Sequence, residues 1–343
     1  MIQFNNKSTI KIVISVVGLT ALFAVSAMAQ YGSGGGGTGG GGASGGTGGS
    51  AAGGGYGAGP TYNFNGNYHV GFDRPEAWGL KYFTSTTLLS GLQPAEPGEG
   101  QQRIGPITVG LEVGWLPTLD AGQRRIGFNG TAPEDLNKAP VLIRPVVRVG
   151  LPAKFTLIAA APPPFRVFGI TPHLLAFGLE RPILETEQWT LGWRGYGQVG
   201  SVRGAFTCPR SVLAFAPGSA DNPTECVGES SDVASTRYVG SELQFAYRVP
   251  SMPKLVPHVA VGGNFIDGVF HVHAPVEDGL DRSRLWTRGG TFSVTGGVSY
   301  LITRQMAFTV DAFYSPLWVQ RSATERRNDG LFNLRALLSY SFR

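Results

Sequence analysis

The carboxyl-terminal segment of the chain alternates strictly between apolar and mostly polar positions. From Leu331 to Arg343, one set of alternate positions is apolar throughout: Phe332, Leu334, Ala336, Leu338, Tyr340 and Phe342. A period of two residues is that of a β-strand, whose successive side chains point to opposite faces. The segment is therefore predicted to be a strand with one wholly apolar face, suited to a wall between lipid and a hydrophilic interior.

Similar alternating segments of about ten residues recur between turn-rich stretches from Thr61 onward. With the final strand, the pattern predicts twelve strands: Tyr62 to Phe72, Leu80 to Leu89, Ile104 to Trp115, Val141 to Val149, Ala153 to Ala160, Phe168 to Leu179, Gln188 to Arg203, Arg237 to Arg248, Val256 to Val269, Thr291 to Thr303, Met306 to Trp318 and Leu331 to Arg343. Recurrence of such segments is typical of a transmembrane barrel, and an even count places both termini in the periplasm.

Ten or fourteen strands are the alternatives to this count. Gln123 to Asn129 has the composition of a further strand, Leu80 to Leu89 also fits a short plug helix, and the phase of Phe168 to Leu179 is ambiguous. Short links alternate along the chain with long ones, such as Leu116 to Pro140 and Gly204 to Thr236. Short turns are expected at the periplasmic end of a barrel and long loops at the outer end.

The final strand resembles that of Gram-negative outer-membrane β-barrel proteins, which commonly carries an aromatic alternation ending in Phe. Tyr340 and Phe342 match this pattern, although Arg343 follows the phenylalanine. The resemblance implies an all-β, antiparallel up-and-down barrel of the porin-like kind. It also implies recognition of the last strand by the barrel-assembly machinery and contact with outer-membrane lipid and glycolipid.

The start of the chain predicts export. Lys7 and Lys11 precede the apolar stretch that runs from Ile12 to Val25, and Ala27-Met28-Ala29 follows it. This order is that of a cleavable secretory signal, and the apolar run is shorter than a spanning helix needs. We therefore predict a signal peptide at 1–29, a glycine-rich disordered segment at 30–60 and a barrel at 61–343, located in the outer membrane of a Gram-negative bacterium.

Composition agrees with a membrane barrel and excludes nucleic-acid binding. Removal of residues 1–29 reduces Lys plus Arg from 28 to 26 against 23 acidic residues, so the mature formal charge is about +3. That charge is too small to indicate a nucleic-acid partner. Since no apolar run after the signal is long enough for a spanning helix, the chain can enter lipid only as a closed barrel, which leaves no sheet edge unpaired.

Charged side chains fall on the predicted inner faces of the strands. The lumen candidates are Arg144, Arg148, Arg194, Arg248, Arg335, Glu112, Glu242 and Asp311. Five cations against three anions favour passage of small anionic solutes, because a narrow passage strengthens the field of its wall charges. Arg–carboxylate pairs that brace a small, filled barrel are the alternative interpretation.

Two further groups outside the strands have possible chemistry. Cys208 and Cys226, the only cysteines, are 18 positions apart in one loop. In an oxidising compartment we expect a disulfide, which stabilises the loop by roughly 3 kcal/mol. His271 and His273 are weak candidates for metal ligands, but their spacing is not diagnostic, and we predict no metal or other cofactor. Arginines in the loops near Arg284 and Arg326 favour contact with glycolipid phosphates, with plain solvation as the alternative.

Three functions are compatible with these features. The leading hypothesis is a passive channel, the second a closed structural or adhesive barrel, and the third a lipid hydrolase of the outer membrane. The outward faces offer no credible Ser–His pair, so we predict that the protein is not an enzyme. A secreted β-sandwich would share the alternation but not the regular exchange of short and long connections.

Overall fold

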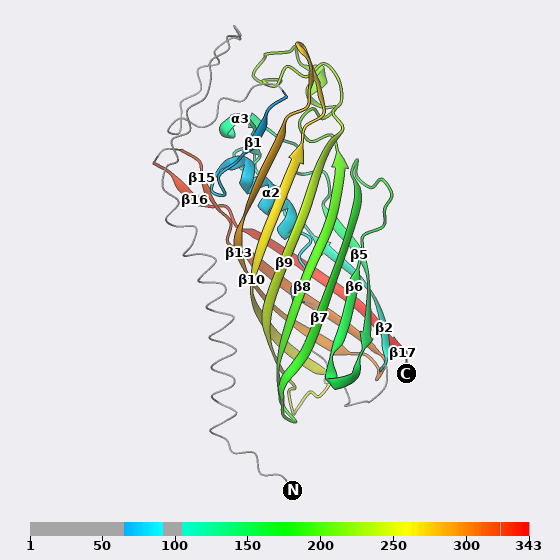
Figure 1. The fold of residues 1–343 in the computed structure, drawn as a ribbon. Coiled ribbons are helices and arrows are strands. Elements are labelled where there is room, and N and C mark those ends of the chain that lie inside the picture. The colour runs from blue at the N-terminus through cyan, green and yellow to red at the C-terminus, as the bar shows by residue number, and fades with distance from the viewer. Residues whose placement is uncertain (1–64, 92–104, 323, 343) are drawn as a thin grey trace.

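The computed structural model describes residues 65–91, 105–322 and 324–342, and these form a closed barrel of ten antiparallel strands (Figure 1). Each strand pairs with the next along the chain, and β17 closes the ring on β2. The ring consists of β2 (Ile107–Trp115), β5 (Val141–Gly150), β6 (Thr156–Ala160), β7 (Thr171–Glu185), β8 (Trp189–Gly204), β9 (Asp232–Tyr247), β10 (Leu255–His271), β13 (Arg284–Leu301), β14 (Met306–Ser315) and β17 (Leu331–Phe342).

The barrel wall is apolar outside and polar inside, as the alternation predicts. On β17 the outward Leu334 and Leu338 are 45% and 48% exposed, while the inward Asn333 and Arg335 are 1% and 3% exposed. A soluble protein would not leave whole strands of large apolar side chains in water. The prediction of a transmembrane-type antiparallel barrel is therefore confirmed. Within the described ranges, no helix has the length and apolar character needed to cross a membrane.

The predicted count of twelve strands is wrong, and the alternative of ten is correct. In the segment Tyr62 to Phe72, the described part contributes only β1 (Asn67–His69), which pairs in parallel with β13 outside the closed ring. The segment Leu80 to Leu89 is not a strand either: α2 (Pro75–Ser85) covers its first part, as the plug-helix alternative proposes. Pro75 at the helix start and Glu76 in the first turn favour this helix.

Other segments also differ from the predicted strands. Gln123 to Asn129 lies in an outer loop, with β3 (Arg125–Ile126), α3 (Gly127–Gly130) and β4 (Ala132–Pro133), so it does not enter the wall. The strand predicted from Ala153 begins at Thr156, because a 3-10 turn, η1 (Pro152–Lys154), precedes it.

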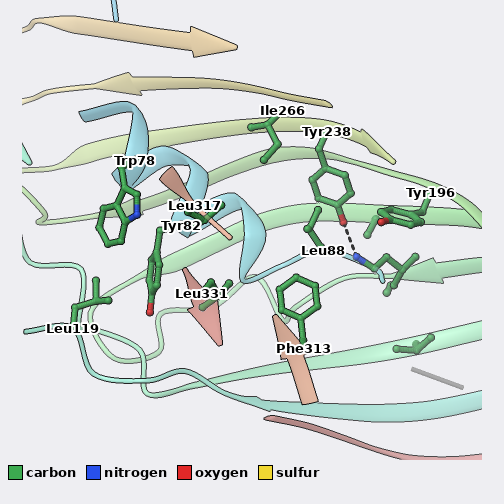
Figure 2. Close-up of a cluster of buried hydrophobic side chains, with 14 of the residues drawn as sticks. Trp78, Tyr82, Leu88, Leu119, Tyr196, Tyr238, Ile266, Phe313, Leu317 and Leu331 are labelled. Carbon is green, nitrogen blue, oxygen red and sulfur yellow. Dashed lines mark hydrogen bonds between the residues drawn. The ribbon is translucent and has the colours of Figure 1, made fainter. Parts of the chain in front are cut away.

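Helix α2 lies inside the outer half of the barrel and is buried on nearly all sides (Figure 1). Trp78 and Tyr82 stack with ring centroids 5.3 Å apart and pack in a cluster with Leu317 and Leu331 (Figure 2). The Lys81 ammonium donates to the carbonyls of Phe72 at 2.6 Å and Trp318 at 2.7 Å. The helix therefore fills the lumen instead of adding to the wall.

This path through the lumen places the described start of the chain at the outer end of the barrel, where the long connections lie. Asn67 pairs with Arg284, the first residue of β13 after an outer loop, whereas Phe342 ends β17 beside Ile107 at the opposite end. The ring itself begins at Ile107 and ends at Phe342 at one and the same end, as an even strand count requires. The position of the first residues of the chain in the periplasm stays a prediction, because residues 1–64 lie outside the described part.

The outer loops fold into a compact crown. It includes η2 (Val212–Ala214), the hairpin of β11 (Ala274–Val276) and β12 (Gly279–Asp281), and the hairpin of β15 (Trp318–Gln320) and β16 (Arg326–Asn328). Cys208 and Cys226 form the expected disulfide, which packs against Val276 in a small buried cluster. The Asp232 carboxylate accepts hydrogen bonds from three backbone N–H groups of the crown, those of Phe206, Thr207 and His273, at 2.8 to 2.9 Å.

We predict that Gly297→Ala destabilises the barrel and that Gly296→Ala does not. His258 and Asp311 lie opposite Gly297 on the two neighbouring strands and meet across it at 2.7 Å, so an added Cβ would collide with Asp311. A Cβ at Gly296 meets nothing within 4 Å. Overpacking of this kind costs about 1–3 kcal/mol. Urea unfolding in detergent micelles, followed by tryptophan fluorescence, measures both variants; equal midpoints would contradict the prediction.

Candidate functional site in the lumen

A short segment after α2, Thr87 to Gly91, crosses the centre of the barrel, and we call it the lumen strap. It has no regular secondary structure, so its backbone groups need partners from the wall. The Tyr238 hydroxyl on β9 donates to the Thr87 carbonyl at 3.0 Å and accepts from the Leu89 N–H at 3.1 Å. Figure 2 shows this ring directed at the strap from the wall.

Three arginines of the wall donate to backbone carbonyls of the strap. Arg144 on β5 donates to Thr87 at 2.8 Å, Arg335 on β17 donates to Leu88 at 3.1 Å, and Arg194 on β8 donates to Gly91. Hydrogen bonds from charged donors are worth about 1.5–3 kcal/mol each. These guanidinium groups, predicted as lumen cations, therefore fix the strap in place.

Carboxylates complete the arrangement around the same segment. Glu242 on β9 accepts from the Ser90 hydroxyl at 2.7 Å and from the Gly91 N–H at 3.2 Å. Arg194 lies 3.1 Å from Glu242 and 2.7 Å from Glu180 on β7, and Glu180 also pairs with Arg148. The wall charges thus form a continuous buried network that encloses the strap.

The charges of this network balance. Four arginines face four carboxylates: Arg144, Arg148, Arg194 and Arg335 against Glu112, Glu180, Glu242 and Asp311, all at most 6% exposed. Glu112 binds Arg144 at 2.6 Å, and Asp311 binds His258. The sequence predicted an excess of cations in the lumen because it included Arg248 and left out Glu180. Arg248 follows the end of β9 and is exposed at the inner end of the barrel.

Glu180 was missed because the sequence pattern ends the strand at Leu179, where the alternation becomes unclear around Pro182. In the structure β7 continues to Glu185 with a register shift between Pro182 and Leu184, so Glu180 faces inward opposite Arg194. A need for an acidic partner for the predicted lumen residue Arg194 could have pointed to Glu180 in the sequence.

The space left beside the strap is small. A cavity of about 10 Å³ lies between Leu89 of the strap and the wall residues Glu112, Arg148 and Arg194. That is roughly the space of a single water molecule. This cavity is therefore too small for a solute.

The candidate metal ligands His271 and His273 do not lie in a cluster of metal-ligand side chains within the described residues. His258 is buried with Nε2 2.7 Å from Asp311 and Nδ1 3.3 Å from the Val256 carbonyl, so both ring nitrogens are occupied within the lumen. His271 and His273 are exposed near the outer end. In the part of the chain that the structure describes, no three His, Cys, Asp or Glu side chains are placed to share a metal ion.

Burial also affects Lys81, which lies on α2 above the strap. Removal from water lowers the pKa of its ammonium to about 7, against an opposing contribution from nearby Asp73. A neutral amine still has two N–H donors, one for each of the two carbonyls that Lys81 binds, those of Phe72 and Trp318. Lys81 can therefore lose its proton and keep both hydrogen bonds.

Comparison with solved structures finds remote likenesses. No family model matches the chain, and no curated protein matches it. The outer membrane protease OmpT of Escherichia coli is 13% identical, with 74% of this chain and 99% of that one covered and a TM-score of 0.36. Neisserial surface protein A is 9% identical (70% and 100% covered, TM-score 0.28), and the Pseudomonas putida toluene transporter TodX is 10% identical (73% and 91% covered, TM-score 0.30). Likenesses at these scores carry no argument about what this protein does.

We predict that Arg194→Met lowers the free energy of unfolding by about 3–5 kcal/mol, since it leaves the buried Glu242 without its cation and the Gly91 carbonyl without its donor. Lys154→Met is the matched control. Lys154 pairs with Glu185 but is 43% exposed, so its loss should cost less than about 1 kcal/mol. Urea unfolding in micelles compares the two; similar losses would show that the lumen network is not a major source of stability.

Lys81 predicts a pH dependence of stability. Between pH 7 and about 10 the folded protein has released the Lys81 proton while the unfolded chain still binds it, so the unfolded state binds more protons and stability rises with pH. Below pH 7 Lys81 is protonated in both the folded and the unfolded state, so its contribution to the free energy of unfolding no longer changes with pH. Lys81→Met should reduce the rise in unfolding midpoint between pH 7 and 10. An unchanged slope would contradict the lowered pKa.

Proposed function

We propose that the protein is an outer-membrane β-barrel whose lumen is closed by its own chain, and that its role is structural or adhesive and not that of a passive channel. The observation that carries this proposal is the bonding of the lumen strap. The arginines that would line an anion pathway donate instead to the strap carbonyls and to buried carboxylates.

The outward face of the wall supports placement in a membrane. Large apolar side chains are exposed on successive strands, and the connections are short at one end and long at the other. We infer a Gram-negative outer membrane, reached by export. The predicted signal peptide and glycine-rich segment lie outside the described residues and stay predictions, as does recognition of the final strand, with Tyr340 and Phe342, by the assembly machinery.

The channel hypothesis would require the strap to leave its site. Breaking only the three arginine–carbonyl hydrogen bonds would cost roughly 5 kcal/mol or more, which leaves fewer than about one molecule in a thousand open. The charge balance of the network also removes the expected preference for anionic solutes. Both arguments favour the closed barrel.

The outer crown supports an adhesive role. Phe165 and Phe168 between β6 and β7 are 61% and 50% exposed, and Val227, the residue after the disulfide-bonded Cys226, is 56% exposed. Apolar side chains held in water on folded loops are typical of surfaces that contact a partner. Hydrolysis of lipid is not supported, because His258 is paired with Asp311 in the lumen and, among the described residues, no histidine ring nitrogen is hydrogen-bonded to a serine hydroxyl.

We predict that the full-length mature protein, inserted in planar lipid bilayers, gives no stable conductance steps over a wide voltage range. A variant lacking residues 75–91, which removes α2 and the strap, should conduct, because the described segment that crosses the centre of the ring is then missing. Circular dichroism and heat-dependent gel migration confirm that each protein is folded. Regular steps from the intact protein, shifted in ion selectivity by Arg144→Glu, would overturn the closed barrel in favour of an anion channel.

A further inference from the structure

A group of arginines lies on the outside of the wall, at the outer end of the barrel. Arg237 on β9 and Arg288 on β13 both lie opposite Asp267, which is on the strand between them. Arg237 is two residues from Val239, which is 62% exposed, and Asp267 is two residues from Phe265, which is 38% exposed. Since side chains two positions apart share a face, these charges are on the lipid-facing side, directly above the apolar band.

These residues line an open cleft. Its volume is about 530 Å³, and its walls include Arg237, Arg288, Asp267, Arg284 and Trp286. The Arg288 guanidinium lies over the Trp286 ring, 5.2 Å from its centroid. Tryptophan is enriched where the lipid meets water, so Trp286 indicates the depth of the headgroups.

The three cleft arginines differ from those of the lumen. Among the residues that the structure describes, none of Arg237, Arg284 and Arg288 forms an ion pair, and the Arg284 guanidinium donates only to the Asn67 side chain, at 3.3 Å. The lumen arginines are each bound to buried carboxylates or carbonyls. The cleft donors are therefore available to a ligand.

We propose that this cleft binds a phosphate group of a phosphorylated glycolipid in the surrounding outer leaflet. Three arginines and one aspartate give the cleft a charge of about +2, which matches a phosphate monoester of about −1.5 to −2. Guanidinium groups bind phosphate oxygens in a bidentate manner. A lipid fits better than a soluble anion, because the apolar band below the arginines receives the acyl chains.

Asp267 lowers the positive charge of the cleft. The aspartate lies between Arg237 and Arg288 in the strand register, so the two cations are on the strands to either side of it. A phosphate can then occupy the space between the guanidinium groups, while a lipid without a phosphate gains only the apolar contact. The inference rests on the proposed placement in an outer membrane and is independent of whether the lumen conducts.

The test uses the full-length mature protein in nanodiscs of zwitterionic lipid. The probes are a disaccharide glycolipid with two phosphates, the same glycolipid after removal of both phosphates, and inorganic phosphate; native mass spectrometry counts bound lipid. Arg237→Gln with Arg288→Gln should weaken binding of the phosphorylated glycolipid at least about tenfold, because two charged donors are lost. Added salt should reduce the difference in affinity between the unaltered protein and this variant, because salt screens the arginine charges.

Arg248→Gln with Arg304→Gln is the matched control. Both residues are exposed near the inner end, so this variant loses the same charge and should bind as the unaltered protein does. Equal binding by the cleft variant and the control would overturn the proposal, as would equal affinity for the dephosphorylated glycolipid. Full competition by inorganic phosphate at equimolar concentration would assign the cleft to a free anion. Conductance from a protein that still binds the glycolipid would overturn the closed lumen but not this site.

Discussion

The structure depends on one constraint, which is that every backbone N–H and C=O group away from water must find a partner in the protein. In the wall this is met by ten strands that close on themselves through β2 and β17, so that no edge faces lipid. The same constraint acts in the centre of the barrel. There an irregular segment survives because arginine, tyrosine and glutamate side chains of the wall take the place of a neighbouring strand.

Buried charge in this protein has a different meaning from exposed charge. Inside, ion pairs such as Arg144–Glu112 orient donors toward the lumen strap, and they stabilise one arrangement of that segment. Outside, the cations of β9 and β13 lie near one aspartate without binding it, at the height where lipid headgroups begin. A sequence that places several arginines on the inner face of a barrel is therefore not by itself evidence for an anion pathway.

The strands near the end of the chain could be predicted closely because one of their faces meets lipid. The alternation reproduces the observed inward and outward sides over Leu331–Phe342 and over Met306–Ser315. The strand predicted to run to Trp318 ends at Ser315, before Pro316, and Trp318 begins β15. Helix α2 was mistaken for a strand from Leu80 onward because it is buried on nearly all sides, so it has no polar stripe of helical period. Glu180 was missed where a register shift near Pro182 disturbs the pattern. The binding of the lumen strap could not be predicted, since its main groups are backbone atoms, which every residue type carries.

The passage of the chain through its own barrel has a consequence for assembly. Residues 67–91 run from the outer end of β13 into the centre, where they bind side chains of β5, β8, β9 and β17. Arg144 and Arg335, which hold this segment, lie on the two strands that flank β2, so they stand on either side of the β2–β17 seam. The full set of these hydrogen bonds therefore exists only in the closed cylinder, and the closure of the wall and the placement of its contents stabilise each other.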